Sequence, residues 1–202
     1  MDINDLLQGQ LPPGLVDQLS QQLGVGDRQK TATAASGIVS TLVSAMAKNA
    51  ASPEGASALA GALDRDHDGS ILDDIMGMVT GQNQAANTKA TNGAGILGHI
   101  LGGRQGGAVD IISQMSGLNN NQTGNLMTML APIIMGALGK AKRSQNLNPT
   151  DIASILSGQV QQQKQVNPNM GLIGKLLDQD GDGSIMDDVG GMLLKNLFKR
   201  RR

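Results

Sequence analysis

The chain has 202 residues and carries 16 Lys and Arg against 17 Asp and Glu, so its formal net charge of −1 gives no overall attraction to nucleic acid or to a membrane surface. It contains no Cys, which excludes disulfides, thiol catalysis and zinc–thiolate sites. It also contains no Trp or Tyr and only one Phe, which argues against base stacking, sugar-binding platforms and large cofactor pockets.

Without those aromatic residues, the core must be filled by Leu, Ile, Val, Met and Ala. These aliphatic residues recur at helical spacing with few β-branched runs, which predicts an all-α, multihelical fold. The N-terminus, Met1 to Asp5, is acidic and lacks the apolar region of a secretory signal. The strongest apolar run, 126–138, is too short to span a bilayer. We therefore expect a cytoplasmic protein.

The first part of the chain is predicted to form helices that begin at capping residues. An irregular segment is expected over 1–13. Helices are expected over about 14–23, 27–49, 53–63 and 71–79. Asp27 is a suitable N-cap, and Ser52 followed by Pro53 is a typical helix start. Residues 1–80 are therefore interpreted as a first helical unit, and the polar stretch 81–93 is the predicted linker.

Residues 94–202 are interpreted as a second helical unit. Helices are expected around His99 and over about 107–116, 122–140 and 149–157, then a Gln-rich surface segment at 159–165, a helix start at Asn167 and a last helix over 189–197. The starts of two of these helices are predicted at Asn121 and Asn148. The stretch Val16–Gln21 is similar to Val109–Gln114, which favours a duplicated helical unit.

Two acidic segments, residues 63–74 and 177–188, hold ten of the chain's seventeen acidic residues and are identical at nine of twelve positions. Each has Asp at alternate positions followed by Gly, which is the start of an EF-hand-like calcium loop. The predicted oxygen ligands are Asp64, Asp66, Asp68, Ser70, Asp73 and Asp74 in the first segment, and Asp178, Asp180, Asp182, Ser184, Asp187 and Asp188 in the second.

The end of each acidic segment departs from a full EF-hand loop. Position 12 should be a bidentate Glu, but it is Ile75 in one segment and Val189 in the other, and the chain's one Glu is Glu54. The paired Asp residues at positions 10 and 11 must then close each loop, so we expect weak to moderate calcium binding with magnesium as a competitor. The alternative is that Ser70 and Ser184 begin capping boxes and that the segments are capped turns without metal.

The C-terminal tail is basic after an apolar helix. Its cationic residues are Lys195, Lys199, Arg200, Arg201 and Arg202. Cations at a helix C-terminus are favourable in themselves, so this interpretation is preferred to docking on an anionic membrane or partner. The two His residues, His67 and His99, have no recognisable catalytic partners, and we expect no enzyme.

Three stretches in the second half of the chain resemble a known family. The stretches Gly95–Gly102 and Leu130–Gly139, together with the second acidic segment, resemble the bacterial YidB-like family, a domain of unknown function, over about residues 93–190. Residues 14–80 resemble a second, less complete copy, and the acidic segments also resemble EF-hand and dockerin loops. The resemblance implies an all-helical fold and a bacterial source, and it implies no known activity.

Two functions fit these observations. The first is a non-enzymatic protein with two variant calcium-binding loops that have a structural role or regulate the interaction with a protein partner. The alternative is a helical interaction or self-association module that binds no metal. Neither function involves nucleic acid.

Overall fold

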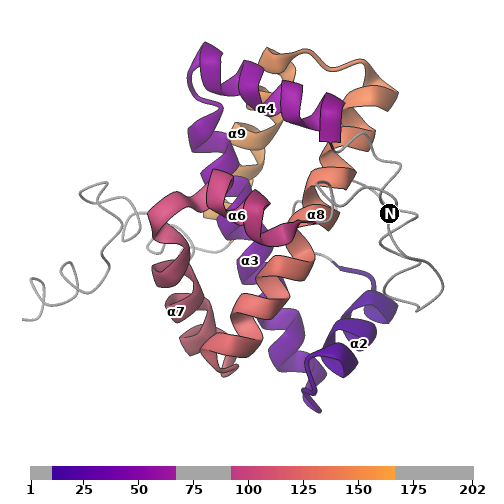
Figure 1. Ribbon diagram of the computed structural model, residues 1–202, viewed down its shortest axis with the longest axis vertical. Coiled ribbons are helices and arrows are strands. Elements are labelled where there is room, and N and C mark those ends of the chain that lie inside the picture. The colour runs from indigo at the N-terminus through magenta and orange to yellow at the C-terminus, as the bar shows by residue number, and fades with distance from the viewer. Residues whose placement is uncertain (1–10, 67–91, 167–202) are drawn as a thin grey trace, which may run out of the picture.

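The structure is a computed structural model of the chain, and it describes residues 11–66 and 92–166 (Figure 1). Every regular element in these two ranges is a helix, which confirms the predicted all-α fold. The elements are α2 (Pro13–Gln22), α3 (Arg28–Asn49), α4 (Pro53–Asp66), α6 (Gly93–Leu101), the short 3-10 helix η1 (Gly102–Arg104), α7 (Gln105–Ser116), α8 (Asn120–Gln145) and α9 (Pro149–Val166).

The predicted helices match the observed ones closely in the interior and less well at their ends. Helix α4 continues past Leu63 to Asp66 and so enters the first acidic segment. Helix α9 continues through the predicted Gln-rich surface segment. Gln161 and Gln162 are exposed, as predicted, whereas Gln159 is only 8% exposed and does not fit that prediction. The predicted helices at 71–79 and 189–197, and the start at Asn167, lie outside the described residues.

The helix starts are fixed by local side-chain caps. Asp27 accepts hydrogen bonds from the backbone N–H groups of Gln29 and Lys30, at 2.9 and 3.3 Å, which confirms its predicted role as the cap of α3. Ser52 caps α4 in the same way by accepting from the N–H of Gly55 at 3.1 Å. Asn148 accepts from the N–H of Asp151 at 3.0 Å and starts α9 as predicted.

The start of α8 differs from its prediction. Asn119, not Asn121, is the N-cap, because Asn119 can form a reciprocal capping box with Gln122. The Asn119 side chain accepts from the N–H of Gln122 at 2.8 Å, and the Gln122 side chain accepts from the N–H of Asn119 at 3.1 Å.

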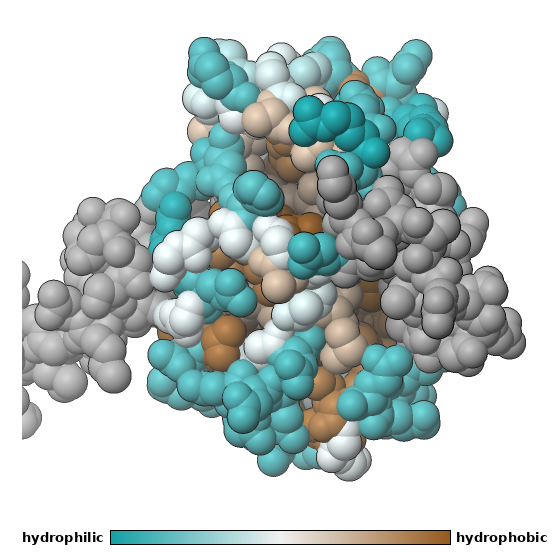
Figure 2. Space-filling view, in the orientation of Figure 1, coloured by the Kyte–Doolittle hydropathy of each residue, from teal (hydrophilic) through white to brown (hydrophobic). Residues whose placement is uncertain are grey.

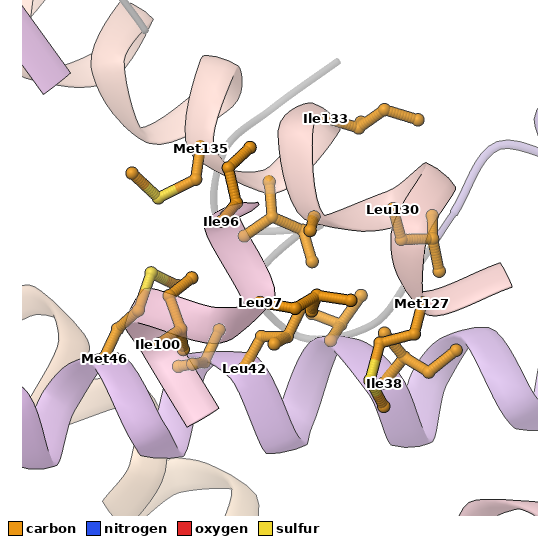
Figure 3. Close-up of a cluster of buried hydrophobic side chains, with 14 of the residues drawn as sticks. Ile38, Leu42, Met46, Ile96, Leu97, Ile100, Met127, Leu130, Ile133 and Met135 are labelled. Carbon is orange, nitrogen blue, oxygen red and sulfur yellow. The ribbon is translucent and has the colours of Figure 1, made fainter. Parts of the chain in front are cut away.

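Helix α3 lies at the centre of the molecule and packs against α2, α6, α7, α8 and α9 (Figure 1). Its side chains Ile38 and Leu42 are fully buried and face Leu97 of α6 and Met127 of α8 in the close-up of Figure 3. These side chains belong to one hydrophobic cluster that includes residues from all seven α-helices of the described ranges. Leu, Ile, Met and Ala fill this core, as the composition predicts.

The two predicted units therefore contribute to the same core. Helices α3 and α4 of the first unit pack against α8 and α9 of the second, and α3 also packs against α6 and α7. Duplication of a helical unit stays a prediction, because the packing joins the two units without showing that one copies the other.

A close backbone contact places α6 across α8. Pro132 lies inside α8 and has no N–H, so it cannot donate to the carbonyl group of Thr128 one turn earlier. Gly93, at the start of α6, packs against that carbonyl oxygen, and a Cβ atom at position 93 would lie 1.9 Å from it. Only Gly fits this contact. Helix α6 ends at Leu101, and its C-cap residue Gly102 has a φ of 56° and a ψ of −134°, which also require Gly.

Candidate functional site

The candidate site is the start of the first acidic segment, where Asp64 and Asp66 lie in the last turn of α4. The other predicted metal ligands, Asp68, Ser70, Asp73, Asp74, Asp178, Asp180, Asp182, Ser184, Asp187 and Asp188, lie outside the described residues. The basic tail, Lys195, Lys199, Arg200, Arg201 and Arg202, lies outside them as well. The calcium loops and the tail therefore stay predictions.

The end of α4 is anchored to the core immediately before the first carboxylate. Leu63 is 1% exposed and belongs to the hydrophobic core. Asp64 follows at the surface, with 61% of its side chain exposed, and Asp66 is half-buried. Two residues separated by one position on an α-helix point about 200° apart around its axis. The carboxylates of Asp64 and Asp66 therefore lie on different sides of α4.

Lys142, from the last turns of α8, forms an ion pair with Asp64. Its Nζ atom donates a hydrogen bond to Asp64 Oδ1 at 2.5 Å. Only 16% of the Lys142 side chain is exposed, so its aliphatic stem is packed against neighbouring groups while the ammonium reaches the carboxylate. The pair connects α4 to α8 between residues that are far apart in the sequence.

The C-terminal end of α4 is a favourable position for a positive charge. A helix C-terminus carries a partial negative charge from its carbonyl groups, so the carboxylates in the last turn of α4 are poorly placed unless a cation balances them. Lys142 supplies one positive charge to Asp64. A bound divalent cation would satisfy the same electrostatic demand more strongly.

The described carboxylates alone do not make a metal centre. Within residues 11–66 and 92–166, no group of three or more His, Asp or Glu residues could hold a metal ion. Asp17 pairs with Arg28 between α2 and α3, and Asp110 accepts a hydrogen bond from Asn120 at 2.6 Å. His99 lies on α6, as predicted, and is exposed.

Lys142 is the one residue of this site that the sequence did not reveal. Its neighbours Lys140 and Arg143 make it one of several cations near the end of a predicted helix, where cations are common. No local pattern connects it to Asp64, because the pairing depends on how α4 crosses α8.

None of the helices in the described part of the chain is long and apolar enough to cross a lipid bilayer. This finding agrees with the length of the apolar run at 126–138, which lies within α8.

Comparison with known proteins gives one family. The model of a family described as "Bacterial protein of unknown function (DUF937)" matches residues 5–141 in a single span. This span includes the predicted linker at 81–93 and stops before the second acidic segment, whereas the resemblance in the sequence was placed mainly over 93–190. Searches of curated proteins and of solved structures find no match. Because the family model covers more than half of the chain, the protein belongs to the bacterial DUF937 family.

Proposed function

We propose that this protein is non-catalytic and that its two acidic segments bind divalent cations, calcium in preference, which fixes the helices around them and regulates contact with a protein partner. The proposal is carried by one carboxylate pattern that occurs twice in the chain, over 63–74 and 177–188. Two carboxylates about 5 Å apart repel by about 3 kcal/mol at an effective dielectric constant of about 20. Five such groups close together in sequence favour binding of a cation.

The environment of α4 supports a structural role for the first segment. Leu63 is buried immediately before Asp64, and α4 packs against both α8 and α9. A cation held just beyond Leu63 would therefore act on a helix that is already part of the core. Its binding free energy would add to the stability of the folded chain, because the unfolded chain has no assembled site.

Calcium is the preferred ion because each segment provides several oxygen ligands within twelve residues of sequence. Calcium accepts six to eight oxygens in variable geometry, whereas magnesium requires a nearly ideal octahedron and retains its waters. The absence of a bidentate Glu at position 12 lowers the expected affinity for calcium. Magnesium is then a competitor and a useful comparison ion.

Thermal unfolding with and without calcium tests this proposal. We expect a few millimolar calcium to raise Tm by about 2–5 °C over the EDTA-treated chain, and equal magnesium to raise it less. The double variants D66N/D68N and D180N/D182N should each lose part of this shift. The control D17N/D110N removes the same charge outside the acidic segments and should keep it. A Tm that calcium leaves unchanged would refute the proposal.

Self-association through a helical surface is the second candidate. On α7, Met115 is 45% exposed, and Ile111, one turn earlier on the same face, is half-buried. Apolar surface is visible on this side of the molecule near α7 (Figure 2). Sedimentation velocity over a range of concentrations tests it, since a metal-independent oligomer that M115Q weakens would favour this function over cation binding.

A further inference from the structure

We propose that helices α2–α4 and helices α7–α9 are two copies of one three-helix unit, a first copy and a second copy. The sequence similarity between Val16–Gln21 and Val109–Gln114 covers only the first helix of each copy. The contacts between helices extend the correspondence to all three helices. The proposal does not depend on cation binding.

The helices of the two copies pack in a reciprocal arrangement. Helix α2 packs against α3 as α7 packs against α8, and α3 and α8 pack against each other. Helix α4 packs against α8 and α9 packs against α3, so the third helix of each copy lies on the long helix of the other. In Figure 1, α2 and α7 lie toward one end of the molecule and α4 and α9 toward the other. An approximate twofold relation between the copies exchanges contacts in this way.

The turn between the first two helices has the same features in both copies. It contains a Gly with a positive φ, which is 63° at Gly24 and 73° at Gly117. The helix that follows is capped by Asp27 in the first copy and by Asn119 in the second. Left-handed glycines and side-chain caps occur between many unrelated helices, so the repeat must also be visible in contacts between the helices.

A surface contact across this turn joins equivalent positions in the two copies. Asp17 of α2 forms an ion pair with Arg28, the first residue of α3. Asp110 of α7 accepts a hydrogen bond at 2.6 Å from Asn120, the first residue of α8. Both Asp residues lie at the same position relative to the glycine of the turn. The same positions meet in each helix pair, which requires a similar crossing of the helices.

A pair of buried hydroxyl groups lies one turn further along each helix pair. Ser113 of α7 donates a hydrogen bond to Thr123 of α8 at 2.8 Å. The equivalent residues are Ser20 and Thr31, which are 4% and 0% exposed, and their hydroxyl groups have no hydrogen-bond partner among the described residues. Buried hydroxyl groups without partners are rare and need an explanation. Descent from the same Ser–Thr contact supplies one, and it predicts that Ser20 and Thr31 lie close together.

The third helices, α4 and α9, correspond in their buried positions. Each begins with Pro directly after a side-chain cap. The fourth, eighth and eleventh residues of each helix are buried on one face, and they are Ala56, Ala60 and Leu63 in α4 and Ile152, Leu156 and Gln159 in α9. Gln159 is the polar member of this set, and its Oε1 atom has no hydrogen-bond partner in the described ranges. A Gln at the position of a core Leu is a departure of the second copy from the repeat.

The copies also differ on the outer side of their first helices. Gln18 and Gln22 of α2 correspond to Ile111 and Met115 of α7. Gln18 and Ile111 are both half-buried, and Gln22 and Met115 are both exposed. The three-helix unit therefore does not require apolar side chains at these two positions. Their presence in the second copy supports self-association as the second candidate function.

Engineered disulfides in the full-length chain test the equivalence, because the chain has no Cys of its own. The variants S20C/T31C and S113C/T123C place thiols at the two equivalent pairs of positions. We expect both pairs to form a disulfide under mild oxidation, which requires Cβ atoms about 4 Å apart. The control S20C/T33C moves the second thiol to a different side of α3 and should keep its thiols free.

Alkylation of the denatured chain followed by intact-mass measurement counts the free thiols. A disulfide in S113C/T123C but not in S20C/T31C would overturn the equivalence of the two copies. Free thiols in both pairs, or a disulfide in S20C/T33C as well, would also overturn it. None of these results depends on calcium, so the proposed cation binding is tested separately.

Thermal unfolding tests the equivalence at the outer positions. The variant I111Q/M115Q gives α7 the Gln residues that α2 has, and it should change Tm by less than about 4 °C. The variant I112Q/M115Q places one Gln at a buried position, equivalent to the buried Leu19, and should lower Tm by more than about 5 °C. Equal losses of Tm in the two variants would contradict the equivalence of α2 and α7.

Discussion

At the scale of single residues, the contact between Gly93 and the Thr128 carbonyl oxygen determines how α6 crosses α8. Pro132 removes the usual helical donor to this oxygen, and Gly93 packs closely against it. A Cα–H group facing a carbonyl oxygen is a weak favourable contact, and the absence of a side chain permits it. One Pro on one helix and one Gly on another thus specify the crossing.

Replacing Gly93 with Ala should destabilise the protein by about 2–4 kcal/mol, because the new methyl group would meet backbone atoms that cannot move without shifting a whole helix. Urea unfolding followed by circular dichroism measures this change. The control is G98A on the same helix, where the added Cβ would meet no atom within 4 Å beyond the adjoining backbone of its own helix. That variant should gain up to about 1 kcal/mol from helix propensity. Equal stability of the two variants would contradict the close contact.

These residue-scale features differ in how far the sequence could predict them. The caps Asp27, Ser52 and Asn148 were predictable because each acts on backbone groups within three residues. The role of Gly93 and the partner of Lys142 were not, because each depends on a group in a distant helix. Two of the six ligands predicted in the first acidic segment, Asp64 and Asp66, lie on a helix, so the ligand pattern does not by itself fix where the helix ends.

At the scale of elements, the start of α8 differs by two residues from the start that the sequence predicts. Asn119, Asn120 and Asn121 are consecutive, and each is an acceptable N-cap residue. Gln122 decides among them, because it lies three residues after Asn119 and completes the capping box there.

Replacing Asn119 with Ala should therefore cost about 1 kcal/mol, the usual value for loss of an N-cap. The same substitution at Asn121, which is exposed inside the first turn, should change the stability by less than about 0.5 kcal/mol. Paired thermal unfolding curves measure both. A larger loss of stability for N121A than for N119A would indicate that Asn121 is the N-cap of α8, as the sequence predicts.

At the scale of the whole molecule, the structure joins the two predicted units through α3. Ile38 and Leu42 of this helix lie beside Leu97 and Met127 from the other side of the predicted linker (Figure 3). The sequence predicts the helices well because their apolar periodicity is local. It does not predict that helices from both units fill a single core, because the same apolar faces could also pair within each unit.

Fragments 1–80 and 94–202 should therefore fail to unfold cooperatively when each is prepared alone, because each loses the partner helices of its apolar face. Circular dichroism melts of the separate fragments and of their mixture measure this. Mixing them should restore part of the cooperative transition. A fragment that melts cooperatively by itself would show that the predicted units are independent domains.

Calcium titration of the intact chain by isothermal calorimetry measures directly whether the acidic segments bind divalent cations. We expect two sites per chain with dissociation constants of about 10⁻⁴ to 10⁻³ M, the range of loops that lack strong closing ligands. D66N/D68N should remove one of these sites and D180N/D182N the other. A folded chain that gives no binding heat up to several millimolar calcium would show that the acidic segments do not bind this ion.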